Sequence, residues 1–144
     1  MPPLRPDSVA DNTPILVGVG QHLERDAAYA LLSPVALAAK AAATALADSG
    51  TAAALAASVD TVAAIRFFEH STRGEAMVAH PFGCSDNVPL AIARRVGIEP
   101  RHAIYADVGG QTPQRLVNRY AAAIHRGEIR SALIVGAEAI ATIK

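Results

Sequence analysis

One stretch of this chain, residues 103–126, combines a strand, a glycine turn and a helix start, and it constrains the fold more than any other stretch. Its first part, Ala103–Val108, is an apolar run typical of a short buried strand. The pair Gly109–Gly110 follows, and glycine lets a backbone turn sharply. Thr112–Pro113 predicts a helix N-cap and first helical residue, because proline lacks an N–H group that would have no acceptor there. Apolar residues recur at helical spacing from Leu116.

We call the glycine turn and helix start at residues 109–112 the elbow. This arrangement directs the unpaired N–H groups and the positive dipole end of a helix at one place. A place of this kind can hold an anion, lower the pKa of a thiol or stabilise an oxyanion. The chemistry of the chain is therefore predicted to depend on residues 109–112.

The composition excludes several classes of protein. The chain has 144 residues, 51% of them hydrophobic, which suits one domain with a core and excludes general disorder. A formal net charge of +0, from 13 basic and 13 acidic residues, argues against a nucleic-acid partner. One cysteine excludes an intramolecular disulfide framework. With no apolar run of membrane-spanning length and no signal-peptide pattern, we expect a cytoplasmic protein.

Strand-like and helix-like segments alternate along the chain. Residues 1–13 are predicted to be a disordered or extended lead-in, and 14–144 an ordered domain. Strands are predicted at Pro14–Gln21, Val59–Phe68, Ala103–Val108 and Ser131–Gly136, and helices at Ser33–Ser49, Pro89–Val96 and Thr112–Gly127. This order predicts an α/β fold with a mainly parallel sheet and helices on its faces. Ligands of such sheets bind at the carboxyl ends of the strands, where residues 109–112 lie.

The segments together resemble the first half of the N-terminal domain of the thiolase superfamily, especially the sterol-carrier-type thiolases and thiolase-like proteins. The resemblance is carried by Thr13–Gln21, the Ser33–Pro34 helix start, the elbow, Gly127–Glu128 and Ala132–Glu138. It implies that 14–144 is a truncated first part of that domain, with about four strands in the order third, second, first, fourth. It also implies that strand 103–108 lies at the sheet edge and pairs with its copy in a homodimer or larger homo-oligomer.

Thiolases make or cleave carbon–carbon bonds in acyl-coenzyme A thioesters, with a nucleophilic cysteine at the start of the helix that begins here near Thr112. Matching Val117–Asn118 and Gly127 to the family puts that position at Gly110, which has no side chain to acylate. We therefore expect no catalytic nucleophile, and substrate contacts from Gly109, Gly110, Gln111 and Thr112. Acyl-coenzyme A is the implied ligand, and no cofactor or metal is implied.

The other residues that could carry chemistry have plainer explanations. Cys84 lies outside the elbow and is expected to be an inert loop or packing thiol. His70 and His80 with Cys84 match no common zinc spacing. Gln111 could donate to a thioester carbonyl or be a solvated turn residue, and both remain open. The other three histidines are expected on the surface: His22, His102 and His125.

Two further patterns concern nucleotide ligands. Gly18 and Gly20 follow a predicted strand, but Leu23 occupies the third glycine position of a dinucleotide fingerprint. A basic cluster could meet the phosphates of a nucleotide-bearing ligand or form a solvated helix face; its members are Arg94, Arg95 and Arg101.

Two functions from different classes follow. The first is a thiolase-like acyltransferase of acyl-coenzyme A and lipid metabolism. The second is a non-catalytic binding or assembly subunit of a thiolase-like complex. Gly110 favours the second function or an atypical enzyme.

Overall fold

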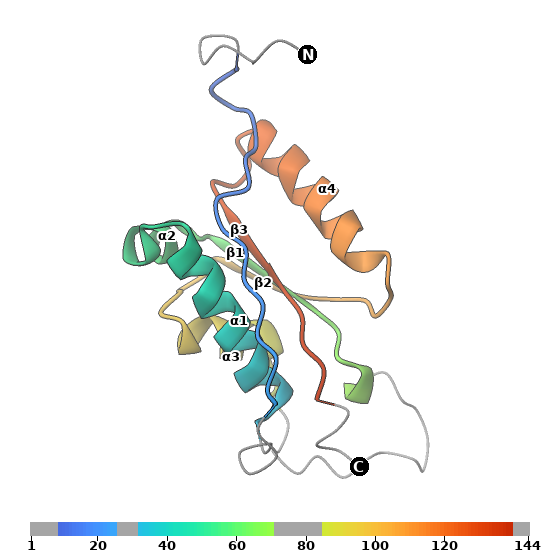
Figure 1. Ribbon diagram of the computed structural model, residues 1–144. Helices are drawn as coiled ribbons and strands as arrows, with labels where there is room; N and C mark the ends of the chain where they lie inside the picture. Colours follow the sequence, from blue (N-terminus) through green and yellow to red (C-terminus); the bar gives the residue numbers. More distant parts are fainter. Residues whose placement is uncertain (1–8, 26–31, 71–84, 140–144) are drawn as a thin grey trace, which may run out of the picture.

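A computed structural model describes residues 9–25, 32–70 and 85–139 of the chain. Its elements, in chain order, are α1 (Pro34–Asp48), α2 (Ala52–Ser58), β1 (Thr61–Ile65), the short 3-10 helix η2 (Phe68–His70), α3 (Val88–Arg95), β2 (His102–Ala106), α4 (Thr112–His125) and β3 (Ala132–Val135). The three strands form one parallel sheet in the order β2-β1-β3, with α1 and α3 on one face and α4 on the other (Figure 1).

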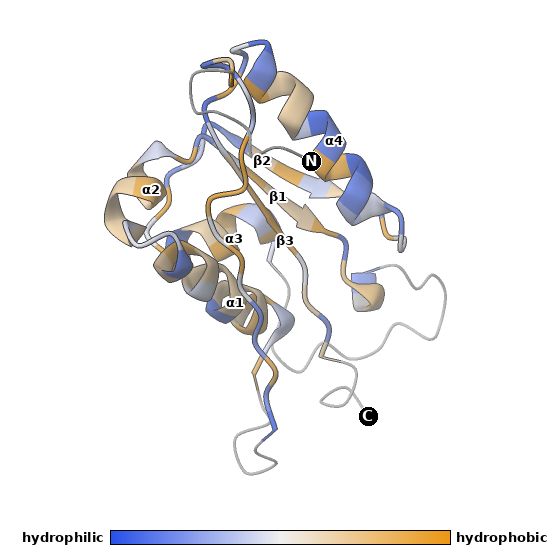
Figure 2. Ribbon diagram, turned by 45° about the horizontal axis from the view of Figure 1, so that its top comes forward, coloured by the Kyte–Doolittle hydropathy of each residue, from blue (hydrophilic) through white to orange (hydrophobic). Residues whose placement is uncertain are grey.

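The central strand β1 is buried on both faces, which explains its unbroken apolar run. Val62 and Ala64 pack toward α1 and α3, while Ala63 packs toward Leu116 and Tyr120 of α4. The strands are accordingly hydrophobic where the helices cover them (Figure 2). Burial of Tyr120 raises the pKa of its phenol, an effect that the nearby Arg119 charge only partly offsets.

Asp60 joins the starts of all three strands. Its carboxylate accepts hydrogen bonds from the Arg130 N–H at 2.9 Å and the Thr61 hydroxyl at 3.1 Å. Its carbonyl accepts from the N–H groups of Arg101 and His102 at 2.8 and 3.0 Å. Because Asp60 is only 8% exposed, these donors satisfy a carboxylate that would otherwise be costly to bury. No motif along the chain singles out this residue.

The predicted sheet order is wrong in one respect. Residues 14–21 form no strand, and the described part of the chain holds three strands where four were expected. The physical reason is that β1 pairs directly with β3, from Thr61 opposite Ala132 to Ala64 opposite Val135, which leaves no place between them. The segment instead runs extended beside α1 and β3 (Figure 1), with Ile15 73% and Leu16 82% exposed.

The N-terminal segment, defined here as residues 14–21, packs on α1 through glycines. A Cβ atom at Gly18 would lie 2.2 Å from the Ala45 carbonyl oxygen, and one at Gly20 would lie 2.2 Å from the Ala41 carbonyl oxygen. The Val19 N–H donates to the Asp48 carboxylate at 2.9 Å. Gly18 and Gly20 thus serve close backbone approach to a helix, and not a nucleotide-binding turn.

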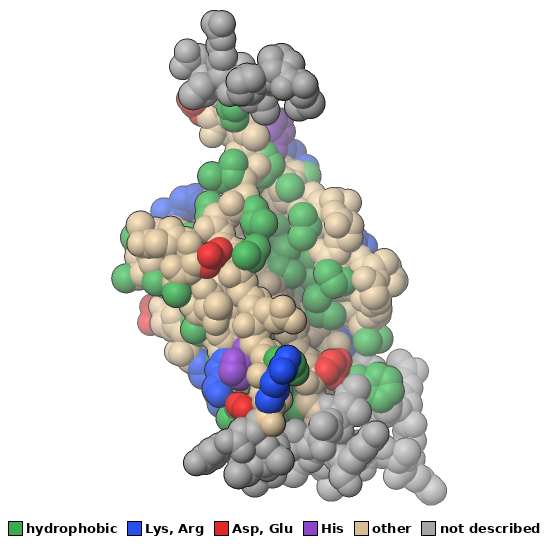
Figure 3. All heavy atoms as spheres, in the orientation of Figure 1, with side chains coloured by type: hydrophobic (Ala, Val, Ile, Leu, Met, Phe, Trp, Pro, Cys, Tyr) green, Lys and Arg blue, Asp and Glu red, His purple; other side chains and the backbone are tan. Residues whose placement is uncertain are grey.

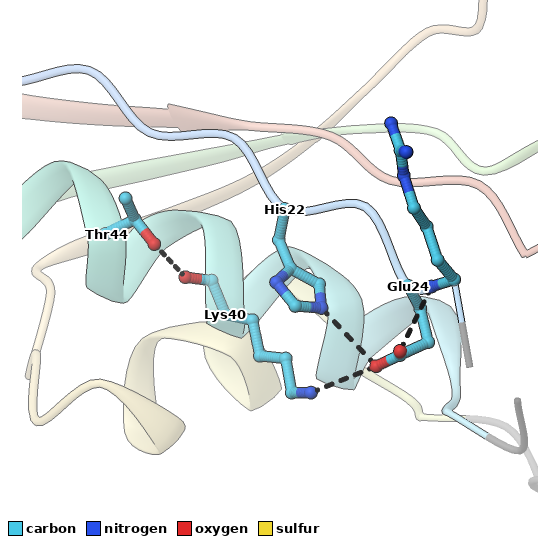
Figure 4. Close-up of polar contacts among 5 residues, drawn as sticks. His22, Glu24, Lys40 and Thr44 are labelled. Carbon is cyan, nitrogen blue, oxygen red and sulfur yellow. Dashed lines mark hydrogen bonds and ion pairs between the residues drawn. The ribbon is translucent and has the colours of Figure 1, made fainter. Parts of the chain in front are cut away.

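An ion-pair group lies just beyond this segment (Figure 4). Glu24 pairs with Lys40 of α1 at 3.3 Å and with the His22 Nε2 atom at 3.6 Å. His22 is partly buried, with 28% of its side chain exposed, because it packs beside Glu24 at the surface of α1. The group connects the chain after the N-terminal segment to the first half of α1.

The three predicted helices and the other three predicted strands are present in the structure. Ser33 caps α1, since its hydroxyl accepts from the Ala36 N–H at 3.1 Å. The three strands that form are each shorter than expected, and β2 lies at the sheet edge as expected. Residues 9–13 of the expected lead-in are exposed, apart from a contact in which the Asn12 side chain donates to the His125 carbonyl at 3.0 Å.

The packing of the N-terminal segment predicts that Gly20→Ala lowers the free energy of unfolding by about 1–3 kcal/mol, because the added methyl group meets helix backbone. Urea unfolding followed by circular dichroism measures this. Gly110→Ala is the matched control, since its Cβ atom meets nothing within 4 Å, and we expect a change within about 0.5 kcal/mol. Equal stability of the two variants would show that the segment does not pack on α1.

Candidate functional site

The elbow after β2 forms a tight turn at the carboxyl end of the sheet. Gly109 has φ +148°, a conformation that side chains rarely adopt, so glycine is required there. The Thr112 N–H donates to the Gly109 carbonyl at 3.0 Å and closes the turn. The N-terminus of α4 therefore lies close to the carboxyl end of the edge strand β2.

The helix start lies one residue from its predicted position. Gln111 is the N-cap, without a capping side-chain hydrogen bond, and Thr112 is the first helical residue. Thr112 is 0% exposed, and its hydroxyl has no hydrogen-bond partner within the described part of the chain. A buried hydroxyl without a partner costs stability, which is a pattern found at functional sites.

The space over Gly110 is open. A Cβ atom added there would have no atom within 4 Å, and Gly110 itself is exposed. The Gln111 carboxamide lies close to Gly109, with its oxygen 2.9 Å from where a Gly109 Cβ atom would be. Arg115, one turn into α4, pairs with Asp107 at 3.1 Å. The elbow thus combines backbone N–H groups, an amide and a hydroxyl around a position without a nucleophile.

A second group of side chains meets at the same end of the sheet. His70 Nδ1 lies 2.7 Å from the Tyr105 hydroxyl, which also accepts from the Phe67 N–H at 3.1 Å. The Arg66 guanidinium lies 5.2 Å from the centre of the Tyr105 ring. The Phe68 N–H donates to the Glu138 carboxylate at 2.8 Å. Of these residues, only His70 is a candidate from the sequence. The others come together because β1 pairs with β2, and the spacing of residues along the chain does not predict that pairing.

The basic cluster lies away from the elbow. Arg101 precedes β2, whereas the elbow follows β2, so the two are at opposite ends of the same strand. Arg94 and Arg95 are exposed residues at the end of α3. Of the two interpretations of this cluster, its exposed position away from the elbow favours a solvated helix face. Arg66 and Arg115 are two arginines that follow β1 and β2 and lie at the same end of the sheet as the elbow.

The other candidate residues are dispersed. His102 and His125 are exposed, as expected. His80 and Cys84 lie outside the described residues. Within residues 9–25, 32–70 and 85–139, no three His, Cys, Asp or Glu side chains gather in a way that could hold a metal ion. No helix in this part of the chain is long and apolar enough to cross a membrane.

Comparison with known proteins places this fold in a class. No protein-family model matches the chain, and no curated protein does. A solved structure does match, with 36% sequence identity and a TM-score of 0.67 over 85% of this chain. The chain belongs to the thiolase-like superfamily. The matching structure is a monomeric SCP2-thiolase like protein type 1 from Mycobacterium smegmatis, and this chain spans 23% of its length.

The buried Thr112 hydroxyl yields a stability prediction. Thr112→Val keeps the side-chain shape and removes an unpartnered polar group, so the free energy of unfolding should rise by about 1 kcal/mol. Urea unfolding measures the change. Thr44→Val is the matched control, since the Thr44 hydroxyl is exposed and donates to the Lys40 carbonyl at 3.1 Å (Figure 4), and no gain is expected. A loss of stability in Thr112→Val would mean that the hydroxyl is satisfied.

Proposed function

We propose that this chain is a thiolase-like acyl-coenzyme A-binding protein of cytoplasmic lipid metabolism, which holds a thioester at the elbow without forming an acyl-enzyme. The observation that carries the proposal is the open space over Gly110 at the N-terminus of α4. A helix N-terminus stabilises negative charge, and a polarised thioester carbonyl carries such charge on its oxygen. The elbow can therefore bind and polarise a thioester, but it lacks the atom that would attack it.

Each elbow residue has a distinct role in this proposal. Gly109 makes the turn, and Gly110 leaves room for the ligand. The exposed Gln111 carboxamide is the side-chain group that can donate to the ligand, and Thr112, whose side chain is buried, closes the turn through its N–H. Acyl transfer, as in thiolases, would require a nucleophile and a base from elsewhere in a longer assembly.

A second candidate function is a non-catalytic binding or assembly subunit. The specific observation in its favour is β2 at the sheet edge, because an unpaired edge strand can pair with another chain. This candidate keeps the fold and its association surface and needs no chemistry at Gly110.

The absent nucleophile predicts no rapid acyl adduct. After incubation with acetyl-coenzyme A at neutral pH, intact-mass spectrometry should show an unmodified chain, or slow partial modification of Cys84 at most. In a Cys84→Ser background, Gly110→Cys should be acylated faster than the wild type, because the introduced thiol would sit at a helix N-terminus. A rapid stoichiometric adduct on wild-type Thr112 or Cys84, located by peptide mapping, would refute the proposal.

The edge position of β2 predicts self-association. We expect light scattering to show a dimer at high micromolar concentration, with the protomers paired through residues 103–108. Hydrogen exchange should then be slower in β2 at high protein concentration than at low concentration, while α2, which is not part of the sheet, serves as the internal reference. A monomer at all concentrations, as in the matching M. smegmatis protein, would contradict the dimer and leave the elbow proposal standing.

A further inference from the structure

A pocket of about 390 Å³ lies beside the second half of α4, at the end of the sheet where the strands begin. Thr61 and His102, the first residues of β1 and β2, line it together with apolar side chains from three elements: Ile104, Ala123 and Ile129. Its volume is typical of small-molecule sites. The elbow follows the other end of β2, so the pocket and the elbow are separate places.

Tyr120 brings a buried hydroxyl to this pocket. The residue is 6% exposed, and its hydroxyl has no hydrogen-bond partner within residues 9–25, 32–70 and 85–139. Burial raises the pKa of the phenol, so the hydroxyl keeps its proton at neutral pH and can donate it to an acceptor. A buried hydroxyl without a partner is costly, and an acceptor in the pocket would remove that cost.

Arg119 adds a positive charge next to this hydroxyl. Its guanidinium lies 5.8 Å from the centre of the Tyr120 ring, and no acidic side chain in the described part of the chain pairs with it. Arg126 also lines the pocket, but both of its hydrogen bonds go to Glu128. Figure 3 shows His and basic side chains gathered where α4 ends. The described lining residues therefore carry one positive charge in excess.

We propose that this pocket binds a small organic acid, with its carboxylate between the Tyr120 hydroxyl and the Arg119 guanidinium. The apolar part of the acid would lie against Ile104, Ala123 and Ile129. One carboxylate matches the single excess charge, whereas a phosphate dianion would keep a charge that nothing compensates. Because the hydroxyl is buried, the acid reaches it when Arg119, an exposed side chain over the ring, changes its rotamer. The inference does not rest on acyl-coenzyme A binding at the elbow.

The test is a titration of the whole chain with butyrate, followed residue by residue through its backbone amide resonances. We expect saturable shifts at residues 102–104 and 119–123. Hexanoate should bind more tightly than acetate, because more apolar surface enters the pocket. Butyramide, which has the same shape without the charge, should bind about tenfold more weakly or less, since hydrogen bonds to charged groups are the stronger ones. The absence of saturable shifts at these residues, or equal binding of butyramide or inorganic phosphate, would overturn the proposal.

Matched variants test the two residues that hold the carboxylate. Arg119→Gln and Arg115→Gln each remove an exposed arginine from α4, and only Arg119 lines the pocket. Tyr120→Phe and Tyr105→Phe each remove a phenol hydroxyl, and only that of Tyr120 belongs to the pocket. We expect Arg119→Gln and Tyr120→Phe to weaken butyrate binding by about tenfold, and the two control variants to leave it unchanged. Circular dichroism checks that each variant folds. Equal butyrate affinity within both pairs would refute the assigned site.

Discussion

The backbone pairing of β1 with both of its neighbours is the interaction on which this structure depends. Parallel strands have their carboxyl ends at the same edge of a sheet. The pairing of Ala64 with Tyr105 and Val135 therefore sets where the segments that follow the three strands leave the sheet. Asp60 secures the opposite end by accepting hydrogen bonds from the beginnings of β2 and β3. The elbow, the His70–Tyr105 contact and Glu138 lie together at one end of the sheet because the register of the central strand brings them there.

Sequence patterns predicted the strands that pair, but they could not show which apolar run stays outside the sheet. Residues 14–21 carry the same β-branched and apolar side chains as β1, and both runs predict a buried strand. The difference lies in tertiary contacts: Gly18 and Gly20 fit against helix carbonyls, while Ile15 and Leu16 remain exposed. Alternate glycines in an apolar run are a signal of close backbone approach that could have separated the two cases.

The elbow itself was predictable, since a strand, paired glycines and a Thr–Pro helix start are all local features. The details of the elbow could not be predicted from the sequence. The helix begins at Thr112 and not after it, which changes Thr112 from a capping residue to a buried hydroxyl without a described partner. Local propensity cannot decide whether the helix begins at Thr112 or at Pro113, because both starts place the proline within the first helical turn. The contacts of Tyr105 with Phe67 and His70 join residues 38 and 35 positions apart, respectively, and they depend on strand register.

The two glycines of the elbow differ in what the backbone demands of them. Gly109, at φ +148°, could not be replaced by another residue without strain. Gly110 has no such φ value and faces open space, so the fold could accept a side chain there. The missing side chain at Gly110 is therefore not a requirement of the turn. In the function proposed above, the turn and the helix N-terminus would bind a thioester, and glycine at a position where the fold tolerates a side chain would leave no atom for covalent transfer.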